Sequence, residues 1–379
     1  MRQYWSKLVV LTLTILSASV FSGCAPEKPH FDTTGRKTIK VNAVKPLPPF
    51  ETRLVNGTEY RISRDPIGQF GGTLFTTSTG SGPKTFNPLV SNDGTSTAAA
   101  GLMFVGLVDT DAYSGLQVPA LAKSVTVLPD NQTYIVTLRK GLQWSDGQPL
   151  TAEDVVFTWN KLILAGLGNP SSRDSVIVNG QLPIVNQVDN LTIKFHTPEP
   201  FAPFLPCLGY SILPKHIIEP VIRHDPKKFD SLWGPSADPK TFVVNGPYIL
   251  ESYESGQRIR YKRNPYYFVM NRENKVLPYI EHYVINMVQD NNADLFQFEQ
   301  NLSDTYGVES DKVKYVRHLE QPNFKLYDLG PAQSTNFLVF NLNPRKNKKT
   351  GQPYVNPIMS SWFRNLAFRK AIDYALDRE

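Results

Sequence analysis

The sequence predicts a turn-rich, mostly β-containing protein of two or three packed domains, and three observations support this prediction. The chain has 379 residues, of which 41% are hydrophobic, so it holds enough core for more than one domain and is not disordered as a whole. Its 30 Pro and 24 Gly residues indicate a turn-rich chain with much β-structure, and they exclude a helical bundle. Strand-like alternation and helix-like spacing also follow each other in short segments. The formal net charge of +6 is spread without a dense basic face, so nucleic acid is not an expected partner.

The N-terminus has the layout of a secretory signal. Arg2 and Lys7 precede an apolar stretch over 8–20, which is followed by small residues and Cys24. The stretch is too short to span a bilayer and predicts that residues 1–23 are a signal peptide. Small residues before a cysteine resemble a bacterial lipobox, in which Cys24 becomes a lipid-modified N-terminus; an ordinary cleavage site beside an incidental cysteine is the alternative. We expect a protein of the periplasm or cell surface, anchored to membrane lipid through Cys24.

The next segment, residues 24–70, is rich in Pro, Lys and Thr and shows little periodicity. We expect it to be a lipid-attached tether. Order is expected to begin at Gly71, where a turn precedes an alternating strand, and a helix is expected over 97–105.

The clearest local structure lies between residues 125 and 166. Residues 133–139 alternate and predict a strand, and Ser145 to Pro149 supply turn residues. A helix is expected from Thr151 to Gly166, with a capping hydroxyl and two carboxylates in its first turn. Its buried stripe is predicted to be Val155, Val156, Trp159, Leu162 and Ile163.

Further elements follow towards the C-terminus. Strands are expected over 192–196, 247–253, 258–263 and 279–287, and a helix over 291–300. The spacing from Phe363 to Ala375 predicts an amphipathic helix, and the sequence then stops without a Gly or Pro signal. We therefore expect the chain to be a fragment.

The sequence carries no motif of a catalytic or metal site. Gly-x-Ser-x-Gly, His-Glu-x-x-His and Cys-x-x-Cys are all missing from it, and its six histidines are scattered. The carboxylates Asp146, Glu153 and Asp154 are explained by a turn and a helix start. We expect no catalytic residue, no metal site and no cofactor.

Several separated segments stand in the order seen in one family. They are 71–74, 86–89, 118–122, 138–155, 245–248, 263–267 and 363–379. The chain resembles bacterial extracellular solute-binding proteins of the peptide/nickel transporter group, family 5, and is similar to oligopeptide- and dipeptide-binding lipoproteins. The resemblance covers about residues 71–379 and is most specific around Trp144.

The resemblance implies an α/β fold of the type II periplasmic-binding-protein class, with two lobes. Residues 71–303 would form the first lobe, with an inserted subdomain at about 89–205, and residues 304–379 would begin a second lobe that is incomplete here. The lobes would close around a peptide or other small solute, which the protein would deliver to an ABC permease in the inner membrane. The resemblance implies a non-enzymatic protein, and we expect a monomer.

The resemblance also implies a ligand site. The loop that holds Asn92, Asp93, Gly94, Thr95 and Ser96 stands where similar proteins place polar residues that contact ligand; an Asx turn that caps the next helix is the alternative. Asn336 begins a segment, 336–341, that matches a strand lining the cleft, although an apolar core strand is the alternative.

Other functions remain open at this point. The same fold could bind a nickel chelate, an oligosaccharide, an opine-like compound or another small solute, or could serve as a peptide-sensing receptor. A secreted lipoprotein enzyme would need a nucleophile with its base or a metal cluster, and an adhesin would need repeats; the sequence shows neither.

Overall fold

The computed structural model describes residues 50–319, 324–329 and 337–376. The described residues divide into two units, one that ends at Tyr306 and one that begins at Gly307. The expected signal peptide, Cys24 and Asn336 lie outside the described residues.

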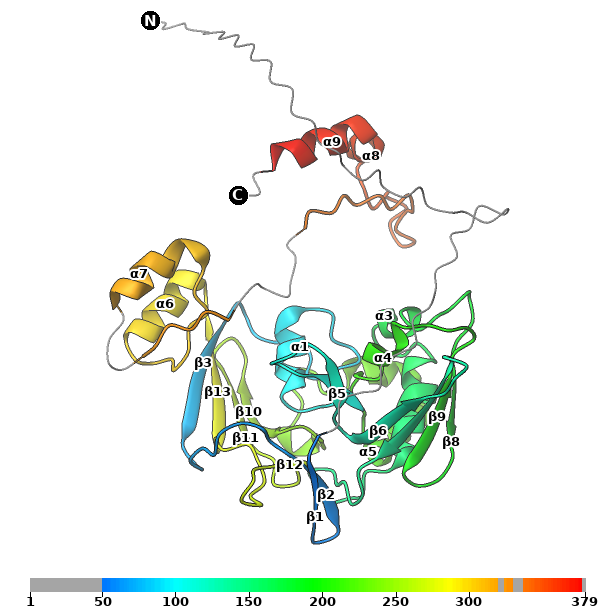
Figure 1. The fold of residues 1–379 in the computed structure, drawn as a ribbon. Helices are drawn as coiled ribbons and strands as arrows, with labels where there is room; N and C mark the ends of the chain where they lie inside the picture. The colour runs from blue at the N-terminus through cyan, green and yellow to red at the C-terminus, as the bar shows by residue number, and fades with distance from the viewer. Residues whose placement is uncertain (1–49, 320–323, 330–336, 377–379) are drawn as a thin grey trace, which may run out of the picture. The chain divides into compact units, whose positions relative to one another are not determined.

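The first unit is built on a mixed four-stranded sheet in the order β10-β11-β13-β3 (Figure 1). Its strands are β10 (Tyr248–Glu254), β11 (Arg258–Arg263), β13 (His282–Val288) and β3 (Thr73–Thr79). Neighbours are antiparallel except β13 and β3, which run parallel from His282 beside Thr73 to Val288 beside Thr79. Because parallel strands end at one edge, the segments that follow β3 and β13 begin side by side.

A second four-stranded sheet is wholly antiparallel, in the order β6-β7-β9-β8. Its strands are β6 (Ala122–Val127), β7 (Thr133–Leu138), β9 (Thr192–His196) and β8 (Ile184–Gln187). All four fall inside the range that we expected for an inserted subdomain. The strands expected over 133–139 and 192–196 are confirmed.

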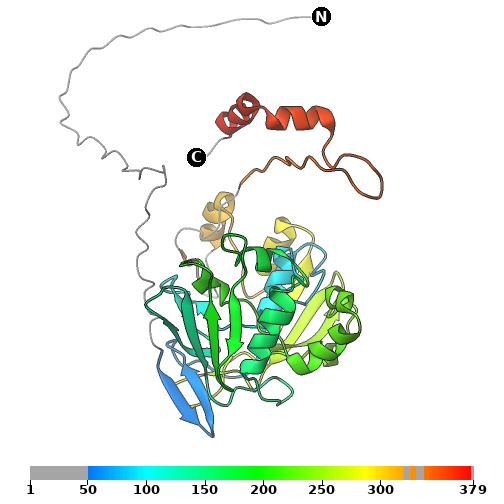
Figure 2. The ribbon, with the colours of Figure 1, turned by 90° about the vertical axis from the view of Figure 1, so that its right-hand side faces the viewer.

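One long helical segment covers this second sheet (Figure 2). It consists of α2 (Ala152–Phe157) and a π-helical turn, Thr158–Ile163. Trp159 is fully buried and its ring meets that of Phe195 on β9, with centroids 5.0 Å apart. The helix predicted from Thr151 is confirmed at its start and in the burial of Val155, Trp159, Leu162 and Ile163. Val156, which we expected in the buried stripe, is only half-buried, and the helical segment ends at Ile163, before Gly166.

Residues 52–62, which we expected to belong to the tether, instead form a β-hairpin. β1 (Thr52–Val55) pairs with β2 (Thr58–Ile62), and β2 pairs in parallel with β12 (Val269–Met270). The turn is Asn56-Gly57, whose φ angles of 49° and 87° are both positive. Asn-Gly is the favoured pair for such a two-residue hairpin turn, so the sequence held a signal that outweighs the local lack of periodicity.

The remaining elements of this unit are short. They are β4 (Val108–Thr110), β5 (Gln117–Pro119), α1 (Gly94–Gly101), α3 (Ser171–Asp174), α4 (Phe204–Cys207), α5 (Lys215–His224), α6 (Asn291–Glu299) and the 3₁₀ turns Pro226–Ser231 and Pro239–Thr241. A continuous hydrophobic core joins the two main sheets, from Tyr134 and Phe195 to Ile259 and Tyr261. In the described part of the chain, none of the helices has the length and apolar character needed to cross a bilayer.

The second unit holds a 3₁₀ turn, Ser310–Lys312, and the helices α7 (Val313–Leu319), α8 (Pro357–Arg364) and α9 (Leu366–Ala375). The helix expected from Phe363 to Ala375 is confirmed from Leu366 onward as α9, but Phe363 belongs to α8, since Asn365 leaves the helical region with a ψ of 120°. Its side chain then caps α9 by accepting from the N–H groups of Ala367 and Phe368. Residues 337–341, expected in a strand, form none, because no described residue pairs with them.

Candidate functional site

The segment that leaves β3 lies where α/β sheets commonly receive ligands, outside the carboxyl ends of the strands. The N–H of Gly80 donates to the carbonyl of Val288 at 2.8 Å, which places the ends of β3 and β13 side by side. The chain then passes through residues 81–88 to the 89–96 loop, which includes all the predicted ligand residues except Asn336, and enters α1 (Figure 1).

Asn87 builds the turn from which the 89–96 loop begins. It is fully buried, its carbonyl accepts from the N–H groups of Val90 and Ser91, and its Oδ1 accepts from the N–H of Leu89 at 3.1 Å. Its Nδ2 donates to the carbonyl of Phe229 at 3.3 Å, so the turn is fixed to a distant part of the chain. The side chain and the carbonyl of Asn87, from which the loop begins, are therefore engaged in hydrogen bonds inside the protein.

Asp93 caps α1, whose first turn is formed by the last three residues of the 89–96 loop. Its Oδ1 accepts from the N–H of Ser96 at 2.9 Å and its Oδ2 accepts from the Ser96 hydroxyl at 2.8 Å. The hydrogen bond from the Ser96 N–H lowers the pKa of the Asp93 carboxyl, and the charge of Lys84 contributes to the same direction. The helix expected over 97–105 thus begins earlier, at Gly94, and ends at Gly101, because Asp93 supplies the cap.

The five contiguous predicted residues differ in what they offer a ligand. Ser96 is buried and its hydroxyl also accepts from the N–H of Lys84 at 2.9 Å, so that side chain is used inside the protein. Asn92 and Gly94 are exposed, and Asp93 and Thr95 are partly so. Within the described residues, no hydrogen bond engages the main chain of Asn92. The polar groups of the loop that have no hydrogen bond among the described residues include the main chain of Asn92, the Asn92 amide and the Thr95 hydroxyl.

The loop also has a partner that the sequence did not predict. Asn169 lies 78 residues from Ser91 in the chain, yet its Nδ2 donates to the Ser91 carbonyl at 3.1 Å. Leu167 to Pro170 read locally as a turn, because Gly and Pro flank the position. Nothing in a single sequence pairs that turn with a loop so far away.

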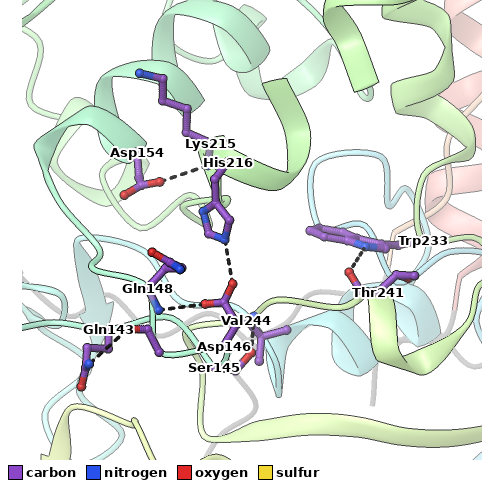
Figure 3. Close-up of polar contacts among 11 residues, drawn as sticks. Gln143, Ser145, Asp146, Gln148, Asp154, Lys215, His216, Trp233, Thr241 and Val244 are labelled. Carbon is purple, nitrogen blue, oxygen red and sulfur yellow. Dashed lines mark hydrogen bonds and ion pairs between the residues drawn. The ribbon is translucent and has the colours of Figure 1, made fainter. Parts of the chain in front are cut away.

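The most family-specific block, around Trp144, forms a structural joint between distant segments of the chain (Figure 3). Ser145 exchanges two hydrogen bonds with Val244, from N–H to carbonyl at 2.9 Å and from the Val244 N–H to the Ser145 hydroxyl at 3.0 Å. Asp146 accepts from the N–H of Gln148 at 3.0 Å and contacts His216 Nε2 at 2.8 Å. The block ties the start of α2 to α5 and to the segment that precedes β10.

Asp154 is the most buried carboxyl of this joint. Its two oxygens accept from the N–H groups of Thr151 and Lys215, each at 3.0 Å. Burial raises the pKa of Asp154, although these hydrogen bonds act in the opposite direction. The predicted explanation of Asp146, Glu153 and Asp154 as turn and helix-start residues is consistent with this geometry: Glu153 lies in the first turn and pairs with the Lys215 ammonium at 3.0 Å.

Two surface pockets lie outside the 89–96 loop. One of about 320 Å³ is lined by Gln148, Pro149, Thr151, Glu153, Asp154, Lys215, His216 and Glu219. The other, of about 500 Å³, is lined by Phe70, Arg263, Asn264, Pro265, Lys275 and Val276. Among the described residues, no group of three or more His, Cys, Asp or Glu side chains is arranged to hold a metal ion.

Solved structures that resemble the chain define its class. MelB from Agrobacterium fabrum, in complex with stachyose, superposes with a TM-score of 0.65 at 21% identity and covers 84% of this chain and 50% of its own. AppA from Bacillus subtilis, in complex with a nonapeptide, gives a TM-score of 0.54 at 26% identity and covers 66% of this chain and 46% of its own. The chain has the α/β type II periplasmic-binding-protein fold, as the resemblance predicted.

The family follows from the sequence. The model of bacterial extracellular solute-binding proteins, family 5, middle part, matches residues 117–379, and the chain belongs to this family. The "Probable ABC transporter-binding protein" of Deinococcus radiodurans is 30% identical over 306 residues, 78% of this chain and 50% of that protein. The periplasmic oligopeptide-binding protein OppA of Haemophilus influenzae is 27% identical over 205 residues, 50% of this chain and 36% of that protein. The chain spans at most about half the length of these relatives.

Proposed function

We propose that this protein is the solute-binding component of an ABC importer and that its solute is a peptide. The observation that carries the proposal is the 89–96 loop, which follows β3 in the chain, is bonded to the protein through Asn87 and Asn169, and leaves the main chain of Asn92 without a hydrogen bond among the described residues. A peptide offers the same groups, a regular series of N–H donors and C=O acceptors.

The mechanism would be addition of the ligand as an extended strand. An extended peptide lying along Asn92 to Gly94 exchanges main-chain hydrogen bonds with the loop, and its side chains point away from it. Main-chain recognition does not depend on peptide sequence, so the loop supplies affinity while other parts of the protein set selectivity. The loop belongs to the first of two lobes, which close by a hinge motion and remove the ligand from water.

Relatives support the choice of peptide. OppA of Haemophilus influenzae is named as an oligopeptide-binding protein, and AppA of Bacillus subtilis holds a nonapeptide. The loaded protein would dock on an inner-membrane permease, act as a monomer and catalyse nothing. Asn336 remains a predicted contact from the second lobe.

Calorimetric titration of the complete gene product tests the proposal. The panel is a random-sequence tetrapeptide library, stachyose, a nickel–histidine complex and deoxycholate. We expect heat of binding with the peptide library at micromolar affinity, which corresponds to about −8 kcal/mol. Binding of stachyose or nickel–histidine with no response to peptide would contradict the choice of a peptide as solute. The importer role would then have to be tested with the solute that binds.

We also propose that Cys24 carries the lipid that holds the protein at the outer side of a membrane, in the periplasm or on the cell surface. A Cys24→Ser variant should lose palmitate labelling and appear in the soluble fraction, because one lipidated cysteine supplies the anchor. A Cys207→Ser variant is the control, since Cys207 is the other cysteine of the sequence. Membrane retention of the Cys24→Ser protein would contradict this proposal.

A further inference from the structure

Residues 167–170 contact the 89–96 loop. They follow the π-helical turn Thr158–Ile163, which belongs to the helical segment that covers the second sheet. The N–H of Asn169 donates to the Leu89 carbonyl at 2.7 Å, and its side-chain Nδ2 donates to the Ser91 carbonyl at 3.1 Å. The Oδ1 of the same amide accepts from the N–H of Ser171 at 3.1 Å, at the start of α3. Both ends of the Asn169 amide are therefore engaged, which fixes its orientation towards the loop.

Gly168 lets the two segments approach each other. Its φ is +75°, and an ideal Cβ would lie 2.4 Å from the Leu89 carbonyl oxygen and 3.2 Å from the Phe229 ring. Any larger residue would push the Leu89 carbonyl away, because real Cβ atoms do not approach an oxygen that closely. The contact between residues 167–170 and the loop thus depends on the hydrogen bonds of Asn169 and on the missing side chain of Gly168.

These contacts decide which main-chain groups of the loop face inward. The carbonyls of Leu89 and Ser91 point to Asn169, and the carbonyl of Asp93 accepts from the N–H of Thr97 at 3.0 Å. A further bond joins the hydroxyls of Ser91 and Thr97 at 2.7 Å. The carbonyls of alternate residues are thereby bonded to the protein, whereas the main chain of Asn92 between them has no hydrogen bond among the described residues.

We infer that Asn169 and Gly168 are positioning residues, which hold the main chain of the 89–96 loop in the conformation that receives the solute. The inference rests on the proposed function and adds that ligand affinity depends on residues of the inserted range that do not touch the ligand. A strand-like ligand needs donors and acceptors in fixed directions, and a loop that had to be ordered on binding would bind more weakly.

Asn169→Asp is the direct test in the complete gene product, because it removes the donor to the Ser91 carbonyl and keeps the acceptor for Ser171. We expect about tenfold weaker binding of the random tetrapeptide library, the effect of losing one partly buried hydrogen bond. Amide hydrogen exchange should also become faster at Val90, Ser91, Ser96 and Thr97, whose N–H groups are bonded within the loop region. Gly168→Ala should also weaken library binding and speed up amide exchange at these positions, with the Asn169 side chain intact. It replaces Asn169→Asp as the test if that variant does not fold.

Asn160→Asp is the matched control. It introduces the same charge and removes the donation from Asn160 Nδ2 in the π-helical turn to the Val185 carbonyl on β8, at 2.9 Å, and it leaves the hydrogen bonds of the loop described above untouched. We expect it to leave both library affinity and loop exchange unchanged. Equal effects of Asn160→Asp and Asn169→Asp, or unchanged exchange in Asn169→Asp and Gly168→Ala, would overturn the inference. Absence of library binding in the wild type would instead reject the peptide proposal, and loop exchange alone would then decide the positioning role.

Discussion

The 89–96 loop and the joint around Trp144 are both dense in polar contacts, yet they use their hydrogen-bonding groups differently. In the joint, Ser145 and Asp154 are engaged with main-chain groups of distant segments, and Trp144 itself is fully buried. In the loop, the buried side is equally well bonded through Asn87 and Asn169, but the exposed main chain at Asn92 has no partner among the described residues.

The difference separates a scaffold from a candidate recognition surface. The Trp144 block was the most specific part of the family resemblance, whereas the ligand role of the 89–96 loop was only implied by it. A strongly recognisable block can therefore be one whose main role is to hold distant segments together, whereas a ligand site keeps exposed polar groups free. The predictions below change one region and measure both stability and library binding.

The largest effect is expected from Trp144→Ala. Loss of a fully buried Trp side chain should lower the free energy of unfolding by about 3–5 kcal/mol, measured by urea denaturation. Library affinity of the molecules that remain folded should be unchanged, because the joint does not belong to the loop. Trp362→Ala is the control, since Trp362 is 53% exposed and its removal should have little effect. A large loss of affinity in folded Trp144→Ala protein would contradict the separation.

Asn87→Ala should affect both quantities. It removes a donor to the Phe229 carbonyl and an acceptor for the Leu89 N–H in a fully buried site, so the free energy of unfolding should fall by about 1–3 kcal/mol. The loop would lose its starting turn, and library binding should weaken with it. If denaturation shows the loss of stability but calorimetry shows full affinity, the turn does not support the ligand site.

The pH dependence of stability should have opposite signs for Asp93 and Asp154. The pKa of Asp93 lies below its ordinary value of 3.8, so its contribution is present above about pH 4 and is lost as pH falls through the folded-state pKa. Burial raises the pKa of Asp154, so the contribution of its protonated form is present at low pH and is lost as pH rises through the folded-state pKa. Urea midpoints of Asp93→Asn, measured from pH 3 to 7, should fall increasingly below wild type as pH rises.

Asp154→Asn should show the reverse trend, with a gap to wild type that narrows as pH rises. Above the raised pKa, the buried negative charge of Asp154 destabilises the folded wild type, whereas the amide of the Asp154→Asn variant carries no charge. Parallel curves for the two variants would show that the carboxyls are in equivalent environments and would remove this difference between the regions.

The smallest effect is expected from His216→Ala. His216 and Asp146 form a contact of 2.8 Å, but both side chains are about one-third exposed. Such pairs contribute about 0–1 kcal/mol, so the melting temperature should change little and library binding should stay the same. A loss comparable with that of Trp144→Ala would mean that this pair is essential to the joint.

Local patterns in the sequence predicted much of the first unit. The strands at Thr133 and Thr192 and the helix at Thr151 followed from alternation and from a capping residue, which act over a few residues. The hairpin at Asn56 was missed although its turn pair was visible, and the break at Asn365 was missed because spacing continued across it. The hydrogen bond from Asn169 to Ser91 could not be predicted, since it depends on how distant segments pack.

The central claim is that the exposed main chain of the 89–96 loop receives the solute. A crystal structure of the complete gene product, grown with the random tetrapeptide library, tests it most directly. The account predicts ligand main-chain atoms within hydrogen-bond distance of the Asn92 backbone, with Asn169 still bonded to Ser91. A peptide bound elsewhere, with no contact to residues 92–94, would contradict it.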